Sequence, residues 1–253
     1  MFDDSILAAI RDHASAEWPN ESCGVVRQRG DRIEYRACSN VADDPKVGFV
    51  IAKREVDIVR RGWRILSIIH SHPNGYPAPS ALDMARQRQW DIPWGIVASF
   101  RTGSGAPLFF GADAPKEPLM DRSFIHGWQD CKAFLDDWFR EERGVELLDM
   151  PRDWEWWLNS RTNLYLDHLA EAGFHAVATD RTSARSALRA GDCILFSVRS
   201  RVGPNHAGIY VGDGMFVHHP SARLPVSEAH RPLKSVYLGP WETRATHWLR
   251  HVG

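Results

Sequence analysis

The sequence predicts an α+β protein of two domains. At 253 residues the chain is long enough for two domains of ordinary size, and 43% hydrophobic with 25% charged residues is a typical globular balance. Helical and strand-like apolar spacings mix up to residue 110, and the apolar pattern then lapses between residues 111 and 122. Seven of the 11 tryptophans follow that lapse. We therefore expect domains at residues 1–112 and 123–253, joined by a linker at 113–122.

The first half has the pattern of a mixed α/β domain. Residues 5–18 have helical apolar spacing and stop at Pro19, which lacks the amide hydrogen that a helix needs. Two strand-like runs flank Gly30 and predict a hairpin. In chain order we expect a helix at 5–18, strands at 23–27 and 32–37, a helix at 52–61, a strand at 65–69, a helix from residue 81, and strands at 94–100 and 107–110.

Two histidines close the apolar strand at 65–69. Residues two apart on a strand face the same side, so His70 and His72 can point both imidazoles at one place. Ser80 can cap the next helix, which puts Asp83 in its first turn. Two imidazoles, one carboxylate and a water make the open tetrahedral site of a catalytic zinc. The sequence therefore predicts Zn²⁺ bound by these two histidines and Asp83.

Glu21 stands just before an apolar strand and could take the proton from a metal-bound water. Other interpretations exist for each piece. Ser80-x-x-Asp83 is also an ordinary capping box, and a His-x-His at a strand end is more often surface or hydrogen-bonded core than metal ligand.

Together these residues resemble the signature of the JAMM (MPN) zinc metallopeptidases. That signature is a distant glutamate, then His-x-His, seven residues, a serine, two residues and an aspartate. The resemblance implies a JAMM/MPN-like domain with His70, His72 and Asp83 as zinc ligands. It also implies Glu21 as catalytic glutamate, Ser80 as the residue that steadies the tetrahedral intermediate, and cleavage of peptide or isopeptide bonds.

The second half opens with a candidate nucleophile. A glycine turn enters an amphipathic helix and places Cys131 in its first turn. The positive end of the helix dipole is expected to lower the pKa of that thiol. Strand-like runs follow at residues 191–197, 206–212 and 215–219.

His206 is the candidate base for this thiol. With a three-residue loop centred on Asp213, position 208 pairs with 218, which puts His218 on the same sheet face as His206. A two-residue loop would favour His219 instead. The predicted set is Cys131 as nucleophile, His206 as base, and His218 orienting His206 through its far nitrogen.

Four features resemble the NlpC family of cell-wall cysteine peptidases: Asp-Cys opening a helix, Gly-Asp-x-x-x-Phe, His-x-Gly-Ile-Tyr-x-Gly, and a histidine twelve residues after the first. The resemblance implies a papain-like fold and a triad of Cys131, His206 and His218. The chain departs from that family where Lys132-Ala133 replaces Ser-Gly and where His126 replaces a tyrosine.

The order of the two domains resembles the tail tip proteins of lambda-like phages. This resemblance implies a protein made in the host cytoplasm and assembled into the virion tail tip with other tail tip proteins. It further implies that the cysteine domain cuts peptidoglycan stem peptides at the host cell wall. The alternative is a structural assembly protein whose peptidase-like sites are inactive or used only in tail morphogenesis.

The composition argues against several other classes. A net charge of −1 without a basic run does not favour nucleic-acid binding, and no apolar run reaches the ~20 residues of a membrane helix. The four cysteines are widely spaced, so neither a disulfide framework nor a thiolate zinc site is expected. Asp192, Cys193 and the tryptophans at 154, 156 and 157 are interpreted first as structural.

Overall fold

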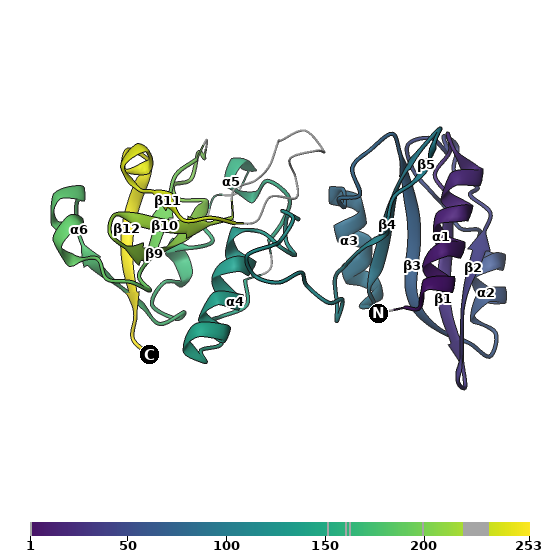
Figure 1. Ribbon diagram of the computed structural model, residues 1–253, viewed down its shortest axis with the longest axis horizontal. Coiled ribbons are helices and arrows are strands. Elements are labelled where there is room, and N and C mark those ends of the chain that lie inside the picture. The colour runs from purple at the N-terminus through teal and green to yellow at the C-terminus, as the bar shows by residue number, and fades with distance from the viewer. Residues whose placement is uncertain (1, 151, 160, 162, 199, 220–232) are drawn as a thin grey trace. The chain divides into compact units, whose positions relative to one another are not determined.

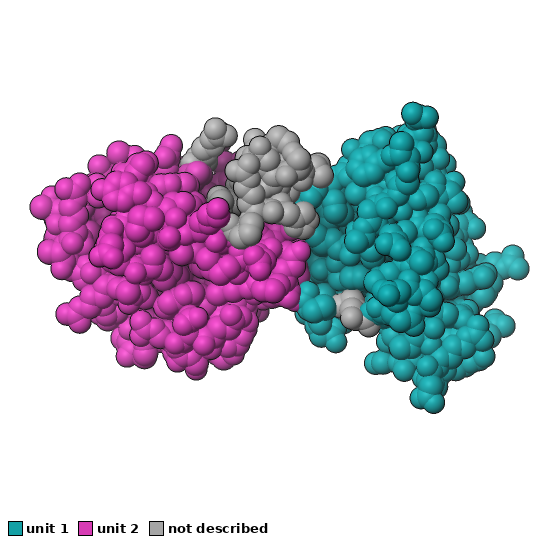
Figure 2. All heavy atoms as spheres, in the orientation of Figure 1, with its two compact units in different colours: residues 1–115 teal, residues 116–253 magenta. Residues whose placement is uncertain are grey.

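A computed structural model of the chain describes residues 2–150, 152–159, 161, 163–198, 200–219 and 233–253 (Figure 1). The chain divides into two compact units, residues 1–115 and 116–253 (Figure 2). Each unit combines helices with a six-stranded sheet, so the predicted two-domain α+β fold is confirmed. Within the described ranges, every helix is too short or too polar to cross a membrane.

The first unit is built on a mixed sheet with the strand order β2-β1-β3-β4-β5, and β6 also pairs with β4. Only the β3–β4 pair is parallel among these strands. The unit consists of α1 (Asp4–Glu17), β1 (Cys23–Arg29), β2 (Arg32–Cys38), α2 (Lys53–Arg60), β3 (Arg64–Pro73), α3 (Ala81–Trp90), β4 (Trp94–Phe100), β5 (Gly103–Ser104) and β6 (Leu108–Phe110).

Helix α1 covers one face of this sheet. Its buried residues Ile6, Ile10 and Ala14 pack against a cluster that includes Ile69 of β3. Because neighbouring residues of a strand face opposite sides, His70 points to the other face, where it contacts Phe49. Helix α1 thus packs on the side of β3 that carries Ile69, and the two histidines lie on the opposite side of the strand.

The second unit has one antiparallel sheet with the order β11-β10-β9-β8-β12-β7. Strand β12, from the end of the chain, lies between two strands that precede it. The elements are α4 (Cys131–Arg143), α5 (Trp156–Asn159), a 3₁₀ turn (Leu166–His168), β7 (Phe174–Ala178), α6 (Arg181–Ala187), β8 (Cys193–Phe196), β9 (His206–Gly212), β10 (Met215–His218), β11 (Val236–Tyr237), a second 3₁₀ turn (Gly239–Trp241) and β12 (Ala245–His251).

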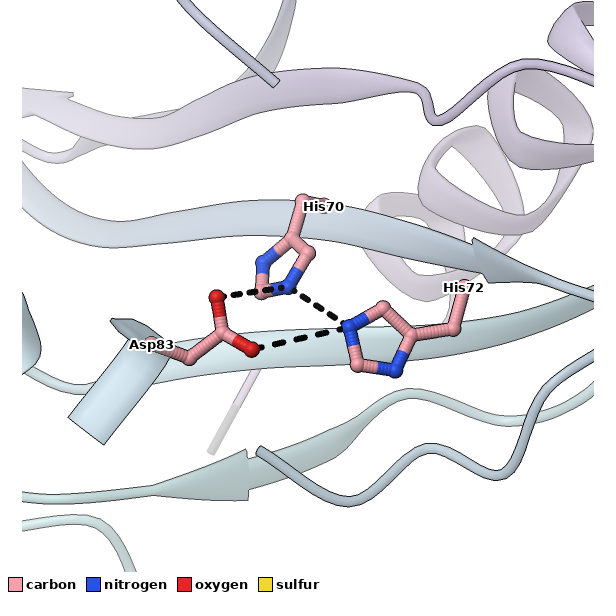
Figure 3. Close-up of side chains that lie close together, drawn as sticks. All are labelled: His70, His72 and Asp83. Carbon is pink, nitrogen blue, oxygen red and sulfur yellow. Dashed lines mark hydrogen bonds and ion pairs between the residues drawn. The ribbon is translucent and has the colours of Figure 1, made fainter. Parts of the chain in front are cut away.

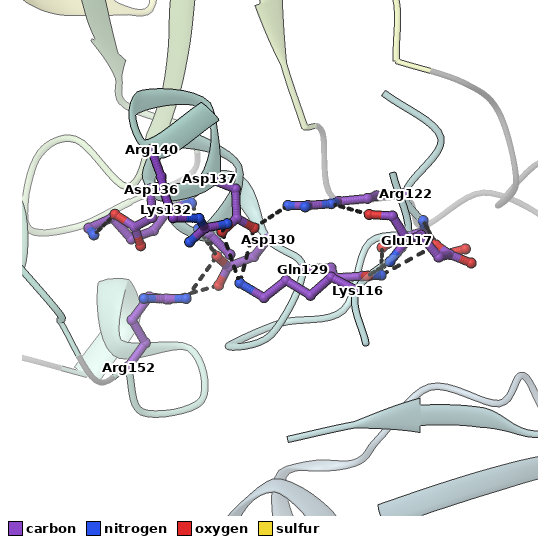
Figure 4. Close-up of polar contacts among 12 residues, drawn as sticks. Lys116, Glu117, Arg122, Gln129, Asp130, Lys132, Asp136, Asp137, Arg140 and Arg152 are labelled. Carbon is purple, nitrogen blue, oxygen red and sulfur yellow. Dashed lines mark hydrogen bonds and ion pairs between the residues drawn. The ribbon is translucent and has the colours of Figure 1, made fainter. Parts of the chain in front are cut away.

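Helix α4 is fixed from two sides. Phe134, Leu135 and Phe139 lie in the main core with residues of β8 and β9. On another side the fully buried carboxylate of Asp137 pairs with Lys116 at 3.0 Å and Arg122 at 2.5 Å, and also with Arg140 (Figure 4). The segment expected as a linker therefore includes residues that bind the helix carrying Cys131.

Two of the structural interpretations are confirmed. Asp192 is buried and forms a two-point ion pair with Arg250, and Cys193 lies in the core. All four cysteines are free thiols. Trp156 also packs in the core but lines a cavity as well, and Trp154 is 45% exposed.

Candidate metal and cysteine sites

The first unit brings His70, His72 and Asp83 together (Figure 3). His70 Nε2 lies 3.1 Å from His72 Nε2 and 3.4 Å from Asp83 Oδ1, and His72 Nε2 lies 3.6 Å from Asp83 Oδ2. Two ligands at a tetrahedral zinc with bonds near 2.0–2.1 Å are about 3.3 Å apart. The three donor groups therefore fit the face of a tetrahedral metal site.

Burial and hydrogen bonding act on the two histidines in different ways. His72 Nδ1 donates a hydrogen bond to the Tyr76 carbonyl at 3.0 Å, which leaves the Nε2 lone pair of the neutral ring for a cation. Burial lowers the pKa of His70 and keeps that imidazole neutral. Burial acts in the same direction on His72, but hydrogen bonds with Asp83 and Tyr76 outweigh it and raise the pKa of His72.

Asp83 supplies the negative charge of the cluster. Burial opposes its ionisation, yet hydrogen bonds with His70 and His72 hold the pKa of Asp83 well below its usual range. The capping box is formed, since the Ser80 amide donates to Asp83 Oδ2 at 2.8 Å and Ser80 Oγ accepts from the Asp83 amide at 3.2 Å. Ser80 Oγ also donates to Asp83 Oδ2 at 2.7 Å. Ser80 as a residue is exposed, and its hydroxyl lies beside the cluster through its bonds with Asp83.

Glu21 lies close enough to His72 and Asp83 to interact electrostatically with both. A link between strands fixes its position, because the next residue, Ser22, donates its amide to the Ser71 hydroxyl at 2.8 Å. Burial raises the pKa of Glu21 to about 7. The charge of His72 opposes this rise, and the charge of Asp83 adds to it. A carboxylate with that pKa can accept a proton near neutral pH.

The cysteine site starts at the N-terminus of α4. Asp130 caps the helix by accepting the amides of Lys132 and Ala133, and it also accepts the Gly127 amide. The Arg152 guanidinium binds the same carboxylate at 2.8 and 3.0 Å (Figure 4). Burial opposes ionisation, but Arg152 and these amides lower the pKa of Asp130 to about 2.

Cys131 follows this buried carboxylate directly. Its Sγ lies 3.5 Å from the Tyr165 hydroxyl and 3.9 Å from the Asn205 carbonyl oxygen. Burial, reinforced by the Asp130 charge, raises the pKa of Cys131 to about 11. The lowered pKa expected from the helix dipole is therefore wrong in direction, because desolvation and a neighbouring anion outweigh the dipole.

His206 and His218 form a hydrogen-bonded pair. His206 Nε2 lies 2.7 Å from His218 Nδ1, and the register pairs His218 with Gly208. The predicted pairing is confirmed, although the loop length is not. Asp213 and Gly214 form a two-residue turn with positive φ at both positions, and a bulge after Met215 shifts the register back.

Burial favours the neutral form of both histidines of the pair. Burial, with a contribution from His218, lowers the pKa of His206 well below its usual value. Burial and the neighbouring His219 lower the pKa of His218 to about 4. His219 instead contacts the ring of Phe124 at 5.4 Å.

Cys131 and His206 line one cavity of about 670 Å³. Its other lining residues combine aromatic rings with charged, polar and aliphatic groups: Phe124, His126, Asp130, Arg152, Glu155, Trp156, Trp157, Leu158, Tyr165, Val198, Asn205, Trp241 and Arg244. The residues that depart from the NlpC family pattern have different surroundings. His126 lines the cavity, whereas Lys132 is buried in an ion pair with Asp136.

The sequence pattern did not identify three residues of this site. Tyr165 contacts the sulfur, Arg152 neutralises Asp130, and the Trp241 ring lies 4.6 Å from His218. Arg152 and Tyr165 lie in other segments of the chain than Cys131. Helix or strand periodicity therefore cannot predict that they lie near it. The only available signal was composition, since tryptophans gather in the second half.

Comparison with known proteins assigns both units. The family described as prokaryotic homologs of the JAB domain matches residues 3–105, and the NlpC/P60 family matches residues 107–249. A desampylase of Haloferax volcanii is 35% identical over 91 residues, which cover 33% of this chain and 66% of that protein.

Two phage proteins are similar over most of the chain. Tail tip assembly protein K of Escherichia phage N15 is 31% identical over 246 residues, covering 97% of this chain and 93% of that protein. Tail tip assembly protein K of Escherichia phage lambda is 34% identical over 192 residues, covering 74% and 82% respectively. The resemblances inferred from the motifs are thereby confirmed. The chain belongs to the family of tail tip assembly protein K, with a JAB-like domain followed by an NlpC/P60 domain.

Proposed function

We propose that this protein is a phage tail tip component with two peptidase sites, and that the cysteine site cleaves peptidoglycan stem peptides during infection. The observation that carries this proposal is the 670 Å³ cavity that Cys131 and His206 share, with His206 held by His218. A cavity of this size accommodates a short peptide. The names of the phage relatives support the location in a tail tip.

The histidine pair supports one route for the proton transfer. Because His206 Nε2 is engaged by His218, its Nδ1 is the nitrogen that takes the proton from Cys131. The sulfur then attacks the scissile carbonyl carbon, and the same imidazole protonates the leaving amine. The amides of Lys132 and Ala133 already donate to Asp130, so we assign the Cys131 amide to the oxyanion.

Purified protein incubated with peptidoglycan fragments tests the cysteine site. The wild type should release soluble peptides, and Cys131→Ala should not. Cys193→Ala serves as the matched control, because that thiol is equally free but lies in the core away from the cavity lining. Equal release by wild type and Cys131→Ala would show that Cys131 is not the nucleophile.

For the first unit we propose a zinc hydrolase that cleaves a peptide or isopeptide bond. His70, His72 and Asp83 would hold the ion. A bound zinc would polarise the scissile carbonyl and acidify a water. Glu21, whose pKa is about 7, is suited to take a proton there at neutral pH, and the hydroxyl of Ser80, an exposed residue beside Asp83, would steady a tetrahedral intermediate.

Elemental analysis tests the metal assignment. Wild-type protein should carry close to one zinc per chain, and His70→Ala should carry far less. His168→Ala is the control, since that partly exposed histidine pairs with Glu171 and belongs to the other unit. Zinc absent from the wild type, or equal in His70→Ala, would remove the proposal for this unit.

A second candidate function is tail assembly without catalysis, which the printed names of both phage relatives favour. Complementation separates the two candidates. If phage carrying Cys131→Ala together with His72→Ala assembles and infects as well as wild type, assembly is the main role. If particles form but fail to infect, the peptidase proposal is supported.

A further inference from the structure

Tyr165 is the side chain that contacts the reactive sulfur most directly. It is 4% exposed, lies just before the first 3₁₀ turn of the second unit, and comes 34 residues after Cys131 in the chain. Its hydroxyl oxygen is 3.5 Å from Cys131 Sγ, which is an ordinary distance for a hydrogen bond to sulfur. Tyr165 also lines the cavity that contains His206.

The buried side-chain amide of Asn163 fixes the backbone of Tyr165 and so the position of its hydroxyl. Asn163 Oδ1 accepts the backbone amide of Tyr165 at 3.1 Å. Asn163 Nδ2 donates to the carbonyls of Val202 and Pro204, both at 2.9 Å. Pro204 lies two residues before His206, so Asn163 ties the tyrosine to the segment that leads into the base. The rings of Trp156 and Tyr165 meet in a T-shaped contact with centroids 6.1 Å apart.

We propose that Tyr165 is a catalytic residue of the cysteine site, whose hydroxyl donates a hydrogen bond to Cys131 Sγ and stabilises the thiolate. In the reaction the thiol proton passes to His206, and the sulfur lone pair forms the bond to the scissile carbonyl carbon. When the C–N bond breaks, the proton passes from His206 to the amine. Tyr165 keeps its own proton throughout.

Two arguments indicate that the Tyr165 hydroxyl donates a hydrogen bond and does not give up its proton. Burial raises the pKa of Tyr165 well above its usual value, so the phenol stays protonated over the working pH range. A hydrogen bond to an ionised acceptor is roughly twice as strong as one between neutral groups. The bond therefore strengthens as charge develops on Cys131, which is the condition for lowering a barrier.

Alkylation of Cys131 in Tyr165→Phe tests the hydrogen bond without any substrate. Full-length protein is treated with iodoacetamide from about pH 7 to about pH 10, and modification is followed by mass spectrometry of the peptide containing Cys131. Loss of a donor to a charged group should slow the reaction about tenfold at each pH, equivalent to a rise of about one unit in the thiol pKa. A misfolded variant would expose the thiol and react faster, so unfolding cannot mimic this result.

Tyr210→Phe is the matched control. Its hydroxyl accepts the Gly214 amide at 3.0 Å, in the same unit but away from the cavity lining, and its removal should leave the alkylation rate unchanged. An unchanged rate in Tyr165→Phe would overturn the hydrogen bond to the thiolate.

The catalytic part rests on the proposed peptidase function and has its own readout. Tyr165→Phe should lower kcat on peptidoglycan fragments about tenfold and change KM little. Slower alkylation with normal kcat would overturn the catalytic role. If Cys131→Ala keeps full activity, the proposed function fails, and the alkylation rates still decide whether Tyr165 stabilises the thiolate.

Discussion

Replacing Asp130 by asparagine should weaken the second unit and make Cys131 more reactive. The substitution keeps the shape of the side chain and can keep the helix cap, because an asparagine oxygen also accepts the amides of Lys132 and Ala133. It removes the negative charge that pairs with Arg152, whose side chain is only 8% exposed. The result isolates the effect of charge from the effect of capping.

The magnitude follows from the shift in pKa. The folded protein lowers the pKa of Asp130 to about 2, against about 3.9 in an unfolded chain. Two units correspond to about 2–3 kcal/mol of unfolding free energy at neutral pH. Because the folded pKa is depressed, this stabilisation is present above about pH 4 and is lost as the pH falls toward about 2. Asp130→Asn should therefore lose about 2–3 kcal/mol at pH 7, and its stability should depend less on pH in that window.

The same change should lower the pKa of the thiol. The Asp130 charge is one of the two main causes that raise the pKa of Cys131, and removing it leaves the Arg152 charge, which acts in the opposite direction. Alkylation of Cys131 at pH 7 should accordingly be several-fold faster than in the wild type.

Hydrogen exchange of peptides from α4 in the full-length protein measures the stability, and alkylation measures the thiol. The control is Asp180→Asn, an aspartate that caps α6 in the same way but is fully exposed and should change neither measurement. Unchanged protection of α4, or slower alkylation of Cys131, would refute the electrostatic reasoning.

Three other predictions concern the metal site, Gly208 and Trp241. His72→Ala should lose bound zinc on elemental analysis. Glu21→Gln should keep zinc, and its hydrolytic activity should fall by about a hundredfold or more. Activity of Glu21→Gln equal to that of the wild type would exclude Glu21 as the base. Gly208→Ala would place a Cβ 3.1 Å from the Cβ of His218 and 2.9 Å from a backbone carbonyl, so chemical denaturation should show a loss of about 1–3 kcal/mol. Trp241→Ala should admit water to the histidine pair and raise the pKa of His218 from about 4 toward its usual value in an NMR titration; an unchanged pKa would contradict this.

The convergence at the metal cluster could be predicted because local geometry produces most of it. Strand alternation aligns His70 with His72, and β3 continues through both as far as Pro73. A capped helix start then fixes Asp83. Each step needs only a few neighbouring residues, which is the range over which periodicity and capping rules hold.

The histidine pair shows where local rules reach their limit. The pairing of position 218 with 208 was right, but a two-residue turn and a bulge produce it rather than the expected three-residue loop. A bulge is set by packing against the rest of the sheet, so the loop sequence does not reveal it. Strand β12 was missed for a related reason, since its place between β8 and β7 depends on pairing with distant segments.

The thiol shows how burial can reverse a local expectation. A helix N-terminus stabilises a negative charge by about 0.3–1 kcal/mol. Burial and Asp130 raise the pKa of Cys131 by about two units, from 9.0 to about 11, which corresponds to about 2.7 kcal/mol in the opposite direction. The aspartate that starts the helix thus opposes the thiolate that the helix would favour. Since burial also keeps His206 neutral, sulfur and imidazole rest as an uncharged pair. In the mechanism that we propose, the nucleophile forms only when the proton moves between them, and groups that hold the resulting charge, such as the Tyr165 hydroxyl, then determine its reactivity.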